Sequence, residues 1–230
     1  VSTLLWLGGA VSPRRDKALI EQLVAKIRQV ALCRELLLAV DGLTSYVKVF
    51  QKAFRSPHRT GKTGRPRLIP WAGIQIVQVV KQRTPDFQIS RRIVQGSNET
   101  IQELLQRSRG GTVINTAYIE RLNATFRQRI SSLTRRSRQA ASQQQTLHAS
   151  MYLVGTIYNF CVPHHSLRLP IWLSPIRKQW VQRTPAMATR LTDHIWTVEQ
   201  LMTFKVAPPP YVPPKRRGRP PKNRNLETIV

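Results

Sequence analysis

The apolar run Leu36–Val40, within the string ELLLAVDG, constrains the fold more than any other segment of this chain. It holds five consecutive apolar residues and is followed by Asp-Gly, a strong turn signal. A short continuous apolar run that ends at a turn predicts a strand buried on both faces, of the kind found in mainly parallel sheets. Because both faces of such a strand need cover, we expect helices to pack on the sheet.

The segments around this strand alternate in type. Residues 1–11 are largely apolar and predict an interior strand, whereas residues 12–31 carry an apolar stripe at helical spacing. Residues 43–54 predict a second helix, residues 55–70 a basic loop and residues 72–83 a further strand. The resulting order of strand, helix, strand, helix and strand predicts an α/β fold with helices packed on a sheet.

Helical periodicity dominates the middle of the chain. Residues 99–108 predict a short helix, and residues 139–160 predict a longer one. Between them, a helix capped by Asn115 or Thr116 should run to about residue 132. The residues expected on its buried side are Tyr118, Leu122, Phe126, Ile130 and Leu133.

The charge balance narrows the class of partner. The 230 residues include 37 Lys and Arg against 11 Asp and Glu, a net charge of +26. Such an excess destabilises a compact fold by self-repulsion unless a polyanion is the usual partner, and nucleic acid is the leading candidate. No run of about 18 apolar residues is present, so no membrane partner is expected. Cys33 and Cys161 lie far apart without a metal-binding spacing, which suits a reducing cytoplasm.

Glu120 is the only acidic residue between positions 104 and 192, a span that holds thirteen Arg and Lys. Helical spacing places Glu120, Asn123 and Arg127 on one face, about opposite the apolar side. One interpretation is a surface ion pair with a neighbouring Arg. The other is a functional carboxylate, because a chain selected only to bind phosphates needs no carboxylate in its most cationic region.

Asp41 is the second isolated acid, at the carboxyl end of the predicted buried strand. Functional groups in open α/β sheets collect at that end, although Asp is also common in turns and at helix caps. Carboxylates in a cationic nucleic-acid groove repel the substrate unless they hold divalent metals. Magnesium is bound by one or two carboxylates together with substrate phosphates, so Asp41 and Glu120 are candidate magnesium ligands.

Two strings that carry these acids resemble a known family. VDGLTSYVKVF, followed downstream by NTAYIERLNATFRQR, resembles the second and third acidic motifs of bacterial insertion-sequence transposases of the DDE type. MYLVGTIYNFCVPHHSLR and RTPAMA look like the signature that closes many such domains. The resemblance covers the chain from Trp6 to about Met187.

This resemblance implies a ribonuclease-H-like mixed sheet flanked by helices, with a long C-terminal helical part. Asp41 and Glu120 would then be the second and third catalytic acids, and both would hold a pair of Mg²⁺ ions. Asn123 and Arg127 would contact DNA beside them, and His164 would be an active-site neighbour.

The implied activity is metal-dependent cleavage of element ends and strand transfer into target DNA, by a homo-oligomer on double-stranded DNA in the bacterial cytoplasm and nucleoid. The family's first catalytic Asp has no counterpart, since Asp16 is explained as an acid in the first turn of a helix. We therefore expect that Asp upstream of Val1, and an N-terminally truncated, inactive fragment. The alternatives are a catalytically degenerate DNA-binding protein and, less favoured by an aromatic content of 7%, an RNA-binding protein.

Residues 207–230 are rich in Pro and basic residues and cannot bury a core, so we expect a disordered tail on a domain of residues 1–206. The tail contains KRRGRPPK, which resembles an AT-hook that enters the narrow minor groove of A·T-rich DNA. Its expected DNA-binding residues are Lys215, Arg216, Arg217, Gly218 and Arg219. A nonspecific basic tail or a localisation signal is the alternative. The string TGRPR repeats the motif's centre, so Arg65 and Arg67 are expected to contact phosphate.

Overall fold

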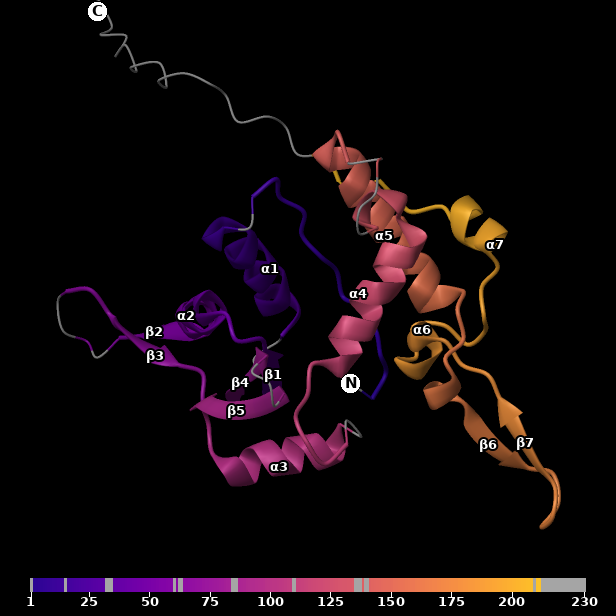
Figure 1. The fold of residues 1–230 in the computed structure, drawn as a ribbon, viewed down its shortest axis with the longest axis horizontal. Helices are drawn as coiled ribbons and strands as arrows, with labels where there is room; N and C mark the ends of the chain where they lie inside the picture. The colour runs from indigo at the N-terminus through magenta and orange to yellow at the C-terminus, as the bar shows by residue number, and fades with distance from the viewer. Residues whose placement is uncertain are drawn as a thin grey trace, which may run out of the picture.

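The computed structural model describes most of the chain up to residue 211 (Figure 1). The described residues are 2–14, 16–31, 35–59, 61, 64–83, 87–108, 111–134, 138, 141–208 and 210–211. They form seven α-helices, one three-stranded sheet and two two-stranded sheets. The predicted mixed α/β class is therefore confirmed.

The central sheet contains the apolar run that constrains the fold. Strand β1 (Leu36–Val40) pairs in parallel with β4 (Ile74–Arg83), and β4 pairs antiparallel with β5 (Phe87–Gln95). The predictions of β1 and β4 are confirmed, whereas β5 was not predicted. Its described side chains are mostly exposed, so this edge strand lacks the apolar pattern of a buried one.

Helices cover both faces of this sheet, as the apolar run required (Figure 1). Helices α1 (Lys17–Val30) and α2 (Thr44–Ala53) pack on one face in a core with Ile74 and Ile76 of β4. On the other face Val77 and Val79 pack against α3 (Asn98–Arg107), with Leu37 of β1 beside them. Each such buried side chain contributes about 1.5–3 kcal/mol.

The segment predicted as an opening strand, described from residue 2 to residue 11, forms no strand. It runs as irregular chain between the sheet half and the helices of the second half of the molecule. The backbone N–H of Trp6 donates to Asn159 Oδ1 at 2.9 Å, and Asn159 Nδ2 donates to the Trp6 carbonyl at 2.8 Å. The Trp6 ring packs against Phe126 and Tyr152, with centroids 5.5 and 5.1 Å apart. The strand prediction is wrong because the apolar segment packs on helices and does not pair with a strand.

The predicted basic loop, residues 55–70, also contains regular structure. Strands β2 (Arg55–His58) and β3 (Arg67–Pro70) form an antiparallel pair that projects from the sheet half (Figure 1). Most of its side chains are exposed, so the pair carries no apolar pattern from which it could be predicted.

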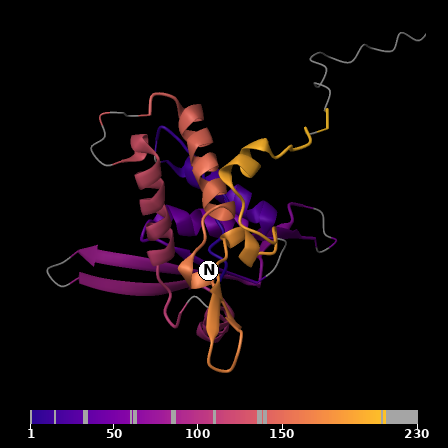
Figure 2. The ribbon, with the colours of Figure 1, turned by 90° about the vertical axis from the view of Figure 1, so that its right-hand side faces the viewer.

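Helices α4 (Ala117–Arg129) and α5 (Gln144–Phe160) lie side by side in the second half of the structure (Figures 1 and 2). Each of these two helices is followed by a single 3₁₀ turn, η1 (Ser131–Leu133) after α4 and η2 (His165–Leu167) after α5. The remaining elements are β6 (Leu169–Trp172), β7 (Lys178–Val181), α6 (Pro185–Ala188) and α7 (Val198–Thr203). This half mixes helices with a hairpin, and a ribonuclease-H-like arrangement stays a proposal.

Gly155 of α5 provides a test of how the N-terminal segment is held. A Cβ atom at Gly155 would overlap the Trp6 ring. We expect Gly155→Ala to lower the free energy of unfolding by about 1–3 kcal/mol, as overpacking does, in urea denaturation. Gln145→Ala, at an exposed position of the same helix, is the control and should change it by less than about 0.5 kcal/mol. Equal stability of the two variants would show that Trp6 does not pack on α5.

Candidate functional site

Asp41 lies directly after β1 and is exposed. Its Oδ1 atom accepts a hydrogen bond from the Leu43 N–H at 3.0 Å, in the turn that leads into α2. Gly42 packs against Val80 of β4, so the chain stays beside β4 after the paired residues end. Asp41 therefore has the turn role considered from the sequence, and it stands at the carboxyl end of a parallel strand.

The start of α4 is anchored to the same sheet. Ile114 is buried in the core that contains Val79, and Arg91 Nε of β5 donates to the Ile114 carbonyl at 2.7 Å. Asn115 Oδ1 accepts from the Ala117 N–H at 3.0 Å, while Thr116 is the buried residue that precedes the helix. These contacts fix the first turn of α4, which carries Glu120.

Glu120 is held by two groups. Lys81 Nζ of β4 forms an ion pair with Glu120 Oε1, and Thr116 Oγ1 donates to the same oxygen at 2.6 Å. The hydrogen bond from Lys81 is the main cause that lowers the pKa of the Glu120 carboxyl, followed by that from Thr116. An ion pair was one of the two sequence interpretations, but its partner is a lysine of the sheet and not a neighbouring Arg.

The pairing register relates the position of Asp41 to that of Lys81, the partner of Glu120. Continuing the parallel register from Val40 and Gln78 places Asp41 level with Val79, two residues before Lys81 on β4. Two residues of a strand span about 6.6 Å. Because side chains alternate along a strand, the positions of Asp41 and Lys81 share the face that carries Leu37 and Val79. Glu120 reaches the edge of the sheet at the carboxyl end of β4 through its ion pair with Lys81.

The chemistry of this edge is compatible with magnesium. Mg²⁺ takes one or two carboxylates plus waters and substrate phosphates, and Asp41 and Glu120 supply two exposed carboxylates. The Lys81 ammonium pairs with Glu120 and so takes the place that a bound metal cation would have beside this carboxylate. Within the described ranges, no group of three or more His, Cys, Asp or Glu side chains could hold a metal by itself. A metal here would therefore take its remaining oxygen ligands from water or from a bound phosphate group.

Asn123 and Arg127 are exposed on α4, as predicted, but they border a different feature from Glu120. Both line a cavity of about 440 Å³ between α4, α1 and the N-terminal segment. The aromatic part of its wall comes from Trp6, Tyr46 and Phe126. Of the predicted buried side of α4, Phe126 and Ile130 are buried, Leu122 and Leu133 half-buried, and Tyr118 exposed. The prediction for Tyr118 was wrong because this residue, on the first turn of α4, lines three surface pockets and is exposed.

His164 lies after α5, packed edge-on against Tyr158 with ring centroids 4.6 Å apart. Its Nε2 atom is buried and has no hydrogen-bond partner among the described residues. Burial lowers the pKa of His164, and the charge of Arg129 lowers it further. Burial raises the pKa of the Tyr158 phenol, and the charge of Arg121 acts in the opposite direction by lowering it. His164 is thus a half-buried residue beside arginines of α4, and its predicted role as an active-site neighbour stays a prediction.

The other predicted DNA-binding residues lie away from this edge or outside the described residues. Arg65 and Arg67 are exposed at the β2–β3 pair. The hook residues Lys215, Arg216, Arg217, Gly218 and Arg219 fall outside the described residues. Their roles stay predictions.

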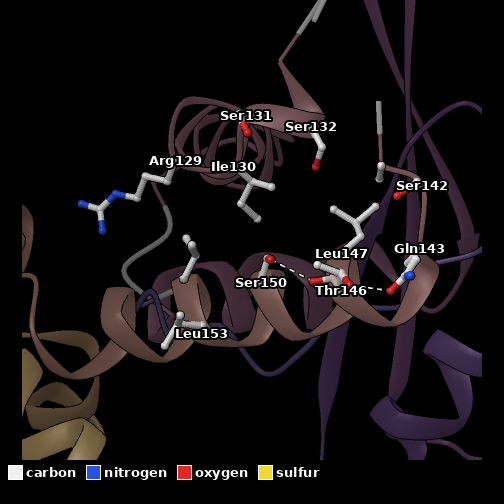
Figure 3. Close-up of a pocket in the computed structure, with 12 residues that line it drawn as sticks. Arg129, Ile130, Ser131, Ser132, Ser142, Gln143, Thr146, Leu147, Ser150 and Leu153 are labelled. Carbon is white, nitrogen blue, oxygen red and sulfur yellow. Dashed lines mark hydrogen bonds between the residues drawn. The ribbon is translucent and has the colours of Figure 1, made fainter. Parts of the chain in front are cut away.

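A separate crevice lies between the end of α4, η1 and α5, with a volume of about 520 Å³ (Figure 3). Ile130 and Leu147 extend into it, whereas the Arg129 guanidinium points away. The hydroxyl of Ser150 donates to the Thr146 carbonyl at 2.8 Å, within α5. The crevice contains none of the predicted site residues, and the hydroxyl of Ser150 is used within α5.

Comparisons of this chain with protein-family models, curated proteins and solved structures find no match. In the part of the chain that the structure describes, no helix is both long and apolar enough to cross a membrane. The resemblance to transposases therefore remains a proposal carried by the residues quoted above.

Sequence reasoning missed two residues that build the site, Lys81 and Arg91, and it named Thr116 only as a candidate helix cap. Lys81 follows the apolar positions Val77 and Val79 in VQVVKQ, and Arg91 lies between Ile89 and Ile93 in ISRRIV. A cation in line with apolar residues was the available signal, because its charge favours a nearby acceptor.

The ion pair with Lys81 predicts how the Glu120 carboxyl titrates. The pKa of Glu120 is depressed in the folded protein, so the pair stabilises the fold above the ordinary Glu pKa and is lost as pH falls through the folded value. Lys81→Met should raise the pKa of Glu120 toward its ordinary range, measured by the carboxyl carbon shift in NMR titration. Lys178→Met, on the β6–β7 hairpin, is the control and should leave that pKa unchanged. An unchanged pKa in Lys81→Met would remove the pair from the site.

Proposed function

We propose that this protein binds double-stranded DNA as a transposase of the DDE type, with Asp41 and Glu120 as two of its catalytic acids. The observations that support the proposal are the strand register, which continues to Asp41 level with Val79, two residues before Lys81, and the ion pair of Lys81 with Glu120, in a chain with a net charge of +26. Carboxylates in such a cationic setting repel DNA unless they serve metal-assisted chemistry. A place in the bacterial cytoplasm, on the nucleoid, and a homo-oligomer on DNA belong to the same proposal.

In this proposal Asp41 and Glu120 hold Mg²⁺ together with phosphate oxygens of the bound DNA. The metal, when bound, supplies Lewis-acid stabilisation of the attacking and leaving oxygens at a phosphodiester. Lys81 keeps Glu120 ionised and oriented before DNA arrives, because the ion pair lowers the pKa of that carboxyl. Asn123 and Arg127, on the exposed surface of α4, contact the DNA backbone.

A catalytically degenerate DNA-binding protein is the second candidate, and a specific observation favours it. Both acids already have structural contacts: Asp41 accepts from the turn amide of Leu43, and Glu120 accepts from Lys81 and Thr116. Acids that serve only these contacts would support the fold without binding metal. The two candidates share DNA binding and differ in whether metal binds at the sheet edge.

Manganese binding in the presence of DNA separates the two candidates. With a duplex present, we expect Mn²⁺ to bind the wild-type chain, read as loss of the free-ion signal in electron paramagnetic resonance. Asp41→Asn and Glu120→Gln should each weaken that binding by about tenfold or more, because each removes a ligand charge. Glu199→Gln, an exposed acid of α7, is the matched control and should bind as the wild type does.

DNA affinity is measured on the same variants by fluorescence anisotropy. Glu120→Gln should bind duplex equally or slightly more tightly, since one negative charge leaves a cationic surface. The logarithm of affinity should fall with the logarithm of salt at a slope of about 0.9 per phosphate contact. DNA binding without Mn²⁺ binding at Asp41 and Glu120 would support the degenerate protein, and absence of duplex binding would end both candidates.

A further inference from the structure

The β6–β7 hairpin projects from the second half of the structure, as both views show (Figures 1 and 2). All residues of its two strands, Leu169–Trp172 and Lys178–Val181, are exposed. The turn is closed by hydrogen bonds from the Leu173 N–H to the Arg177 carbonyl at 2.9 Å and from the Arg177 N–H to the Ser174 carbonyl at 3.2 Å. The hairpin is therefore an ordered element whose apolar side chains meet solvent.

Strand pairing gathers the two tryptophans on one face of the hairpin. Trp172 lies opposite Lys178, and Pro170 lies opposite Trp180. Directly paired residues point to the same side of a sheet, and side chains two positions apart do so as well. The other face carries Ile171 and Gln179 in the same register. The two faces thus differ in chemistry, which provides a matched control within one element.

Cations lie against the tryptophan rings. The Arg168 guanidinium is 3.9 Å from the centre of the Trp180 ring, and Lys178 Nζ is 4.2 Å from that ring and 5.2 Å from the Trp172 ring. No Asp or Glu occurs in residues 121–192, so the face has no acid of its own segment to balance these charges. We name Arg168, Pro170, Trp172, Lys178 and Trp180 the tryptophan face.

The tip of the hairpin exposes apolar side chains. Ile176 is 96% exposed and Leu173 is 54% exposed, and Trp172, at the end of β6, is 62% exposed. Apolar side chains of this size act as wedges between base steps in DNA-binding proteins, and aromatic rings beside cations bind unstacked bases and their phosphates. A polyanion with flat apolar bases therefore complements both the charge and the rings of this hairpin.

We propose that the β6–β7 hairpin binds unpaired bases of DNA, with Ile176 entering the base stack and the tryptophan face stacking on the bases so exposed. Arg168 and Lys178 then neutralise the adjacent phosphates. The inference rests on the proposed function in one respect, that the partner is DNA. It adds a site that distinguishes unpaired from paired strands.

The test compares a forked DNA, half duplex and half single strands, with a fully paired duplex of the same length. The wild-type chain should bind the fork more tightly than the duplex, and its tryptophan fluorescence should be quenched by the fork. Trp172→Ala should weaken fork binding by about tenfold, the size of one lost stacking contact, and leave duplex binding unchanged. Ile176→Ser should reduce the preference for the fork in the same direction.

Ile171→Ala, on the opposite face of the same strand, is the control and should bind both DNAs as the wild type does. Trp172→Phe keeps a ring and should retain most of the fork affinity, which separates lost stacking from a misfolded hairpin. Equal losses in Trp172→Ala and Ile171→Ala, or equal wild-type affinity for fork and duplex, would overturn the proposal. Quenching by anionic phosphatidylserine vesicles but not by the fork would overturn it in favour of a lipid surface. Fork binding that depends on Trp172, without any duplex binding, would uphold this hairpin and reject the proposed function.

Discussion

Strand β4 is the element on which the rest of the described structure depends. It pairs with β1 on one side and β5 on the other, and its buried residues alternate between two cores. Ile74 and Ile76 hold α1 and α2, whereas Val77 and Val79 hold α3 and the segment before α4. Because successive side chains of a strand point to opposite faces of the sheet, Lys81 lies on the same face as Val77 and Val79, where α4 begins.

The Lys81–Glu120 ion pair is the chemical consequence of that geometry. It joins the sheet to α4 across 39 residues of sequence and lowers the pKa of the carboxyl. Both side chains are partly exposed, so the pair contributes little stability and is weakened by salt. An exposed pair of this kind is readily exchanged, and phosphate oxygens or a metal ion can replace either partner.

The second half of the molecule is held by aromatic packing around the N-terminal segment. Trp6 contacts rings from α4 and α5, and its backbone is bonded on both sides to the Asn159 amide. Lys26 of α1 donates to the Gly9 carbonyl at 2.9 Å and to the Tyr152 hydroxyl at 2.7 Å. This segment therefore ties the α4–α5 pair to the sheet half and leaves both hairpins to project.

The sequence by itself determined β1, β4 and the helices α1 to α5, because apolar period and turn signals are local properties of the chain. It also predicts a polyanionic partner, which a charge of +26 favours, and two acids to test; both stay predictions. It did not determine β5, whose described side chains are mostly exposed, nor the fate of the apolar residues 2–11, which pack on helices.

Only the tertiary structure decided that Glu120 meets Lys81, that β1 pairs in parallel with β4, and that Trp172 and Trp180 share a face. The reason is physical: strand register and helix docking join residues far apart in the chain, and no local pattern encodes which partner each will meet.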